Sequence, residues 1–473
     1  MSLHIAFLNP QGNFDAENSH LTAHPDFGGQ LIYVRELALA MARQGARVDI
    51  LTRQIIDDDW QEFHAGLDDF GELSDQVRIV RLPFGGPKFL PKESLWPVLP
   101  EFVDEIIKFY GDDVPDYLTA HYADGGYTAV ALRARTGVGF TFTGHSLGAQ
   151  KMDKLKISTD NFKALDKRFH FAQRIEAERL AMHHADMVVT STQAEADEQY
   201  AHALYQDAAP STPDGFKVIP PGINGKIFHP HGEHDEATAN GAAGRAALSA
   251  MMSGPQVVVS SRLDAKKNIG GVVEAFARSS ALSSRAGLVI CIRGIDDPWA
   301  EVSKLGDDER IVLEPILERI DHSGIRDRVQ FLNIGSQLQL AMTYRWLAES
   351  VSVFALPSLI EPFGLAPIEA AACGLAVAAT RNGGPSEVFG QGEGVLFDPE
   401  NPDDIAAKLI EALDQRDSLR ACALDQIVPR YTWDRTAERY LEVIKRGIGK
   451  ERAPIELPAT LDASERIGNW LAD

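Results

Sequence analysis

Cysteine is scarce in this sequence of 473 residues. Its three cysteines, Cys291, Cys373 and Cys422, are odd in number and lack the spacing of a metal site. They argue against a disulfide framework and favour a reducing compartment. The N-terminus has no basic region followed by a long apolar segment, and no apolar run is long enough to cross a bilayer. These absences predict a cytoplasmic protein with no membrane partner.

Positive charge is also in short supply. The chain has 46 Lys and Arg residues against 68 Asp and Glu residues, which gives a formal net charge of −22. Such a chain repels phosphodiester backbones, so nucleic acid is not expected as a partner. Hydrophobic residues make up 44% of the sequence, as in an ordinary globular protein. At this length, two domains are the default expectation.

Short apolar runs alternate with amphipathic helical stretches along most of the chain. This alternation predicts an α/β fold in which helices cover both faces of parallel sheets. We expect strands at Ile5–Leu8, Val48–Leu51, Val77–Leu82, Leu118–His121, Phe140–Thr143 and Met187–Thr190 in the first half, and at Val257–Ser260, Leu288–Ile292, Val329–Phe331, Val351–Leu356, Leu375–Ala379 and Val395–Phe397 in the second.

A change of composition divides the chain. Pro220, Pro221 and Gly222 end the first half, and a polar stretch rich in small residues follows. Ligands of doubly wound sheets bind at the carboxyl ends of the strands, so the informative residues should follow the strands. We expect a first domain at 1–225, a linker at 226–253, a second domain at 254–430, and a helical segment at 431–473 that packs back on the first domain.

Gly28, Gly29 and Gln30 open the first long expected helix, Leu31–Ala42. Glycines at a helix start let backbone N–H groups approach an anion or a sugar, and the helix dipole favours negative charge there. A plain tight turn is the more frequent explanation of a glycine pair. The glycine pair therefore indicates a ligand site only in combination with the other motifs of the sequence.

Two cations follow the expected strand Val257–Ser260. Arg262 and Lys267 lie five residues apart in one loop and could converge on a diphosphate leaving group. No Asp-x-Asp motif stands in a suitable place, so these cations are expected to do what a divalent ion does elsewhere. No metal site and no cofactor are therefore expected.

The strongest local pattern follows the expected strand Val351–Leu356. Glu361 lies in the loop, where its carboxylate can accept hydrogen bonds from sugar hydroxyls. The N–H groups of Phe363 to Ala366 point out of the next helix start, towards hydroxyls or phosphate. Glu369 lies among Ala and Ile residues, where a carboxylate is costly without partners, and a ribose diol would supply them.

Two glutamates separated by seven residues, preceded by an Arg-x4-Lys loop, resemble the donor site of the retaining glycosyltransferases of family 4. Those enzymes have the GT-B fold, in which two Rossmann-like domains face a deep crevice. Six motifs of the first half resemble those of the bacterial sucrose-phosphate synthases: Ala6–Phe14, His24–Gln30, Pro83–Gly86, Phe89–Glu93, His121–Gly126 and Thr143–Lys151.

The resemblance implies a role for each matching residue. The implied acceptor pocket contains Gly28, Gly29, Gln30, Lys92 and Tyr122, with Ser146, Lys151 and Arg174 on the acceptor phosphate. The implied donor contacts are Gly29, Arg262 and Lys267, then Arg293 and Gly294 near the base, Glu361, Phe363, Gly364 and Leu365 at the hexose, and Glu369 at the ribose. The implied catalytic residues are His145, beside the transferred glucose, with Arg262, Lys267 and Glu361.

The resemblance also implies a reaction. Glucose would pass, with retention, from UDP-glucose or another nucleoside-diphosphate glucose to fructose 6-phosphate, and a sucrose-phosphate phosphatase would act on the product. A sucrose synthase using free fructose, a mannosylfructose-phosphate synthase using GDP-mannose, and a catalytically silent binding protein on the same fold stay open as alternatives. For Arg174 by itself, an ion pair with Glu178, four residues later on the same helix, is as good an explanation as a contact with the acceptor phosphate.

Overall fold

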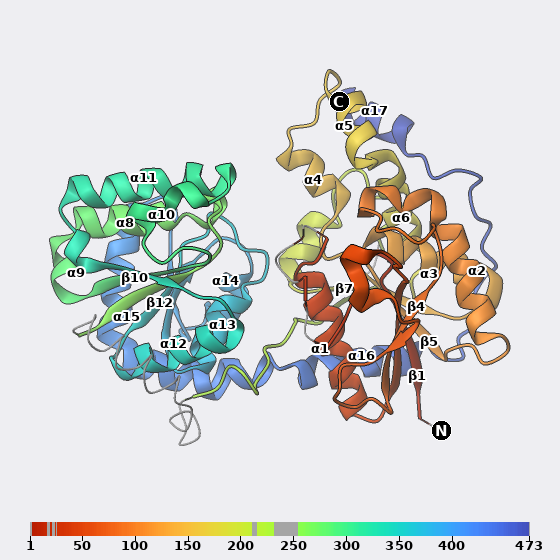
Figure 1. Ribbon diagram of the computed structural model, residues 1–473, viewed down its shortest axis with the longest axis horizontal. Coiled ribbons are helices and arrows are strands. Elements are labelled where there is room, and N and C mark those ends of the chain that lie inside the picture. The colour runs from red at the N-terminus through yellow and green to blue at the C-terminus, as the bar shows by residue number, and fades with distance from the viewer. Residues whose placement is uncertain are drawn as a thin grey trace. The chain divides into compact units, whose positions relative to one another are not determined.

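The computed structural model describes residues 2–16, 19–20, 24, 26–210, 215–230 and 254–472. It divides the chain into two compact units, Met1–Pro221 with Trp433–Asp473, and Gly222–Thr432. Each unit is built on one sheet with helices on both faces (Figure 1). Among the described residues, no helix combines the length and the apolar character that a membrane span requires.

The first unit holds an eight-stranded sheet in the order β3-β4-β2-β1-β5-β6-β7-β8. Its neighbouring strands run parallel, as expected, except the two-residue β3 at the edge, which pairs antiparallel with β4. The strands are β1 His4–Leu8, β2 Arg47–Arg53, β3 Leu67–Asp68, β4 Val77–Leu82, β5 Tyr117–His121, β6 Phe140–Thr143, β7 Met187–Thr190 and β8 Phe216–Val218.

Both faces of the first sheet are buried. Ile5 and Phe7 of β1 point into one core, while Ala6 and Leu8 point into the other, as the two-residue period of a strand requires. α1 (Gly29–Arg43) and α16 (Trp433–Gly447) lie together over the first of these cores (Figure 1). The other core is covered by α2 (Leu99–Tyr110), α3 (Tyr122–Thr136), α4 (Gly148–Lys154), α6 (Phe171–His184) and the C-terminal α17 (Ser464–Ala472), with α5 (Phe162–Phe169) beside it.

The second unit holds a six-stranded parallel sheet in the order β11-β10-β9-β12-β13-β14. Its strands are β9 Gln256–Ser260, β10 Gly287–Ile292, β11 Val329–Asn333, β12 Val353–Leu356, β13 Ala376–Thr380 and β14 Val395–Phe397. One core lies under α8 (Ile269–Arg278), α9 (Ser280–Arg285), α11 (Asp307–Ser323) and α15 (Pro402–Cys422) (Figure 1). The opposite core lies under α12 (Gln337–Glu349) and α13 (Leu365–Ala372); α10 (Pro298–Glu301) and α14 (Gly384–Phe389) are short.

The boundaries between the units differ from the expected ones by a few residues. The Ile223 N–H donates to the Tyr431 carbonyl at 2.8 Å, and Ile223 forms a β-bridge with Thr432. The side chains of Ile223 and Phe228 are buried in the core of the second unit. Residues 222–225, expected in the first domain, and 226–230, expected in the linker, therefore belong to the second unit, while 231–253 lie outside the described residues.

In each sheet the strand order reverses beside the first strand of the unit. β1 has β2 on one side and β5 on the other, and β9 has β10 on one side and β12 on the other. Ligands of open α/β sheets bind at the carboxyl ends of the strands at such a switch point. The loops after β1 and β5, and those after β9 and β12, are therefore where a site is expected.

Candidate active site

Lys267 and Glu361 meet at the switch point of the second sheet. Lys267 ends a short 3-10 turn after β9, and Glu361 lies in the loop after β12. The Lys267 Nζ donates to Glu361 Oε2 at 2.6 Å, and the Ser358 hydroxyl donates to the same oxygen at 3.1 Å. The two side chains are 19% and 15% exposed, so a ligand can reach them. An anionic ligand would compete with Glu361 for the Lys267 ammonium.

Two glycines with positive φ angles lie beside Glu361 and allow its backbone conformation. Gly383, which forms a bridge with Glu361, has a φ of 92°, and a Cβ there would lie 2.3 Å from the Glu361 carbonyl oxygen. Gly364, just before α13, has a φ of 94°. Glycine alone takes such angles at low cost. Among the described residues no side chain caps the start of α13. Phe363 is buried, while Leu365 opens the helix with its N–H available to a ligand.

Arg262, Arg293 and Gly294 follow the neighbouring strands of this sheet. Arg262 comes after β9, is exposed, and forms no ion pair within the described part of the chain. Arg293 and Gly294 come after β10, and the Gly294 N–H donates to Asn333 Oδ1 at 2.9 Å. Because β10, β9 and β12 are adjacent, the loops after these strands share one edge with the Lys267–Glu361 pair.

Glu369 lies on α13 between the fully buried residues Ile368 and Ala370. In the ranges that the structure describes, its carboxylate forms no hydrogen bond or ion pair, although the side chain is partly exposed. Burial raises the pKa of Glu369 to about 7. A partly desolvated carboxylate of this kind would gain from hydroxyl groups of a ligand.

Four expected residues gather at the switch point of the first sheet. Tyr122 begins α3, directly after β5, and the Arg174 guanidinium lies over its ring, 4.5 Å from the centre. Lys92 and Arg174 both act electrostatically on Tyr122 and on Lys151. The Lys92 ammonium pairs with Asp26 at 2.9 Å. The structure thus brings Lys92, Tyr122, Lys151 and Arg174 together from four separate elements.

Lys151 is a cation that forms no ion pair with the described residues. Its Nζ lies 3.8 Å from the centre of the Phe169 ring. Burial and the nearby Arg174 lower the pKa of Lys151 to about 8. A bound anion would stabilise the charged form of this side chain.

Arg174, in contrast, is already paired. It is 4% exposed; its Nε donates to Glu178 Oε1 at 2.9 Å and its Nη2 donates to the Ser146 carbonyl at 2.5 Å. Glu178, also buried, accepts the Gly148 N–H at 3.0 Å and the Tyr205 hydroxyl. The pairing with Glu178 is therefore made inside the unit, and it clamps the loop after β6.

His145 lies in that clamped loop. Its φ of 56° is unusual for a residue other than glycine. Its Nε2 lies 2.9 Å from His121 Nδ1, and the Tyr33 ring meets it edge-on with the ring centres 4.9 Å apart. Burial lowers the pKa of His145 to about 3, so the imidazole is neutral near pH 7. Ser146, next in the chain, is exposed.

No described side chain covers the N-terminus of α1. A Cβ on Gly28 or Gly29 would meet none of the described atoms within 4 Å, so packing there does not explain the glycine pair. Nor does a described side chain cap this helix. Gln30 is held by the amides of Gln11 and Asn9 at 2.6 Å each. This arrangement leaves the N-terminus of α1 available to a ligand.

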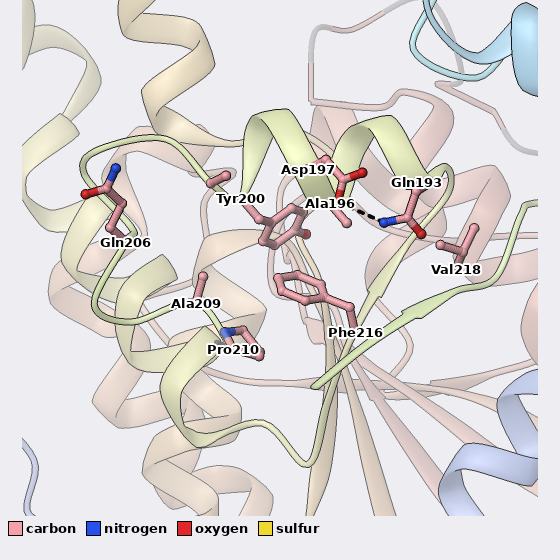
Figure 2. Close-up of a pocket in the computed structure, with 10 residues that line it drawn as sticks. Gln193, Ala196, Asp197, Tyr200, Gln206, Ala209, Pro210, Phe216 and Val218 are labelled. Carbon is pink, nitrogen blue, oxygen red and sulfur yellow. Dashed lines mark hydrogen bonds between the residues drawn. The ribbon is translucent and has the colours of Figure 1, made fainter. Parts of the chain in front are cut away.

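A separate pocket of the first unit contains none of the expected site residues. Figure 2 shows it between the turn Glu195–Gln199 and β8, with Tyr200 and Phe216 on its walls. The Tyr200 hydroxyl accepts the Gly144 N–H at 3.0 Å. Tyr200 therefore links this pocket to the loop of His145.

Sequence reasoning assigns no role to two residues that build this geometry, Asp26 and His121. It gives Glu178 only as the alternative partner of Arg174, and the structure confirms that ion pair. His121 lies at a strand end inside a quoted motif, and a histidine in that position is a usable signal. The role of Asp26 is identified only by its contact with Lys92.

The comparisons with known proteins agree with the fold. Residues 28–208 match a family model described as glycosyl transferase 4-like domain, and residues 245–424 match one described as glycosyl transferases group 1. A sucrose-phosphate synthase structure from Thermosynechococcus elongatus superposes with a TM-score of 0.66 at 23% identity, over 94% of this chain and 98% of that one. The catalytic domain of starch synthase IV from Arabidopsis thaliana gives 0.64 at 14% identity, over 95% and 100%. The protein is a glycosyltransferase with the GT-B fold.

Relatives in sequence narrow this class. A probable sucrose-phosphate synthase from Thermosipho melanesiensis is 43% identical over 444 residues, which cover 93% of this chain and 96% of the relative. One from Vicia faba is 32% identical over 508 residues, covering 93% of this chain and 47% of the relative. The chain thus spans about half the length of that plant relative and nearly all of the bacterial one. It belongs to the sucrose-phosphate synthase family.

Proposed function

We propose that this protein transfers glucose from UDP-glucose to fructose 6-phosphate with retention of configuration, and releases sucrose 6-phosphate and UDP. The observation that carries the proposal is Lys151, a half-buried cation with no described anionic partner, beside Lys92 and Arg174. A sugar phosphate supplies the missing charge, whereas free fructose presents only hydroxyls. The names of the sequence relatives support the same acceptor.

In this proposal the second unit binds the donor without a divalent ion. Arg262 and Lys267 stabilise the charge that develops on the leaving diphosphate. Glu361 accepts hydrogen bonds from the hexose, and the N–H groups at the start of α13 support the hexose or the phosphates. The leaving phosphate takes the proton of the attacking acceptor hydroxyl.

An activity matrix tests the proposal. Purified protein is offered UDP-glucose, ADP-glucose, GDP-glucose and GDP-mannose, each with fructose 6-phosphate or free fructose, and the products are identified. We expect the highest kcat/KM for UDP-glucose with fructose 6-phosphate, giving sucrose 6-phosphate. A preference for free fructose would favour a sucrose synthase, one for GDP-mannose would favour a mannosylfructose-phosphate synthase, and no transfer at all would favour a silent binding protein.

Lys151→Ala should raise the KM for fructose 6-phosphate about tenfold or more, because a charge-assisted contact contributes roughly 1.5–3 kcal/mol. The KM for UDP-glucose and the rate with free fructose should stay unchanged. The matched control is Lys154→Ala, an exposed lysine of the same helix, which should leave every constant within about twofold. An unchanged acceptor KM in Lys151→Ala would remove the main support for a phosphorylated acceptor.

Glu369 should make donor binding pH-dependent. Ribose hydroxyls that donate to its carboxylate favour the ionised form and lower its pKa from about 7, so binding releases a proton. UDP-glucose affinity, measured by calorimetry, should therefore rise several-fold, up to about tenfold, between pH 6 and pH 8. UDP-glucose is the suitable probe because its diphosphate does not titrate in this range.

Glu369→Gln should bind UDP-glucose weakly at both pH values, while Glu400→Gln, an exposed glutamate of the same unit, should behave as wild type. Equal affinity of wild type and Glu369→Gln at pH 8 would exclude the ribose contact.

The product retains its phosphate, so a sucrose-phosphate phosphatase is proposed as the enzyme that acts next. We also propose that the reaction takes place in the cytoplasm. The three free thiols, of which Cys291 and Cys373 are buried, support a reducing compartment.

A further inference from the structure

Three polar side chains, those of Thr119, His121 and His145, are connected by two hydrogen bonds. Thr119 and His121 lie two residues apart on β5, so their side chains share one face of the strand. Thr119 Oγ1 lies 3.1 Å from His121 Nε2, and His121 Nδ1 lies 2.9 Å from His145 Nε2. Thr119 and His121 are fully buried, whereas His145 is partly exposed.

Only two proton arrangements satisfy both contacts when the two rings are neutral. In the first, the Thr119 hydroxyl donates to His121 Nε2, His121 Nδ1–H donates to His145 Nε2, and the proton of His145 lies on Nδ1. In the second, every donor and acceptor is reversed, so that His145 Nε2–H donates inward and its Nδ1 carries a lone pair. The two arrangements present opposite groups to a ligand.

Thr119 decides between them. In the second arrangement its oxygen accepts from His121, and its own hydroxyl hydrogen needs another acceptor. Across the described residues, the contact with His121 is the one hydrogen bond that this buried hydroxyl makes. A buried donor without an acceptor is strongly disfavoured. The first arrangement satisfies every buried donor, and it leaves the one unused donor on the partly exposed ring of His145.

The other groups packed on His145 do not reverse this choice. The Tyr33 ring meets it edge-on, while the Tyr33 hydroxyl donates to the Tyr440 hydroxyl at 3.1 Å. Arg174 holds the same loop through the Ser146 carbonyl, and its other contacts among the described residues are with Glu178 and the Tyr122 ring. The donor-to-acceptor direction of the three hydrogen-bonded side chains is therefore fixed by Thr119 on β5.

We propose that Thr119 and His121 are positioning residues that fix the proton of His145 on Nδ1, so that His145 offers a hydrogen-bond donor to an oxygen of the bound hexose. The identity of the bound sugar rests on the proposed function, but the tautomer does not. An experiment can therefore contradict the proposed glucosyl transfer without contradicting the proposed tautomer of His145, and the reverse.

The tautomer is measured by NMR of the ligand-free full chain, with the histidine ring nitrogens labelled with ¹⁵N. The His145 signals are identified by their loss in His145→Gln. We expect a protonated Nδ1 and an unprotonated Nε2 in the wild type. Thr119→Val, which keeps the shape and removes the hydroxyl, should give a mixture of tautomers, and Thr119→Ser should restore the wild-type pattern. A wild-type proton on Nε2, or a pattern unchanged in Thr119→Val, would overturn the proposal.

Kinetics supply the second readout. Thr119→Val should lower kcat about tenfold while the KM values for donor and acceptor stay within about twofold, since the substrate contacts are untouched. Thr119→Ser should recover most of the loss. A wild-type kcat in Thr119→Val, despite mixed tautomers, would refute the role of the donor. A wild type with no glucosyl transfer would contradict the proposed function, while the NMR result would still stand for the tautomer.

Discussion

Lys267→Ala should lower kcat by on the order of a hundredfold or more, because removing one group that stabilises developing charge costs about 10²–10³ in rate. The structure adds a second cause. Lys267 Nζ donates to Glu361 Oε2 at 2.6 Å, and without it the Ser358 hydroxyl is the one donor that the described residues leave on this carboxylate. In the proposed reaction, the variant therefore loses a cation that stabilises the diphosphate and leaves the Glu361 carboxylate as an uncompensated anion beside it. We expect a larger loss than in Arg262→Ala, whose guanidinium is exposed.

The adjacent lysine supplies the matched control. Lys266 carries the same charge in the same turn, is 55% exposed, and pairs with Asp264 at 3.1 Å. Lys266→Ala should stay within about twofold of wild-type kcat, since surface ion pairs contribute little. Treatment with a chelator should leave the wild type fully active. A Lys267→Ala variant within fivefold of wild type, or activity lost on chelation, would contradict the proposed charge stabilisation by these side chains.

Four of the expected strands match the observed strands at both ends. They are Val77–Leu82, Phe140–Thr143, Met187–Thr190 and Val395–Phe397, and most of their residues are buried. Each of them carries an apolar residue at least at every second position, which is the pattern that a strand facing a core leaves in the sequence. β3 has only two residues, neither of them buried, so the sequence carries no signal for it. Val351, expected in a strand, instead has a φ of 56° and precedes β12, because apolar character does not specify backbone angles.

The rule that ligands lie at strand ends located Lys267 and Glu361 correctly at the edge of the second sheet. It could not show that the two side chains pair, since they lie 94 residues apart in the chain and were expected to serve different parts of the donor. The proton chain to His145 is equally invisible in the sequence. Its direction depends on the burial of a single threonine hydroxyl, which is a tertiary property.

Arg174→Met should lower the free energy of unfolding by about 3–5 kcal/mol, because it leaves Glu178 as an uncompensated charge inside the unit. Both partners are at most 5% exposed, and they join the loop after β6 to α6 through the Ser146 carbonyl and the Gly148 N–H. The loop carries His145, so kcat should fall together with the rise in acceptor KM. Lys151→Ala, in contrast, should leave both stability and kcat near wild type.

Two further variants distinguish between two roles of Arg174, holding the loop after β6 and binding the acceptor phosphate. Arg174→Met combined with Glu178→Met removes both charges, so it should recover part of the lost stability, since a buried pair replaced as a whole is often tolerated. Arg435→Ala breaks an exposed pair with Glu438 in the same unit and should cost less than about 1 kcal/mol. Unfolding in denaturant measures each value. If Arg174→Met retained wild-type stability and kcat and raised only the acceptor KM, Arg174 would act as a phosphate ligand, and the His145 loop would be held in place without it.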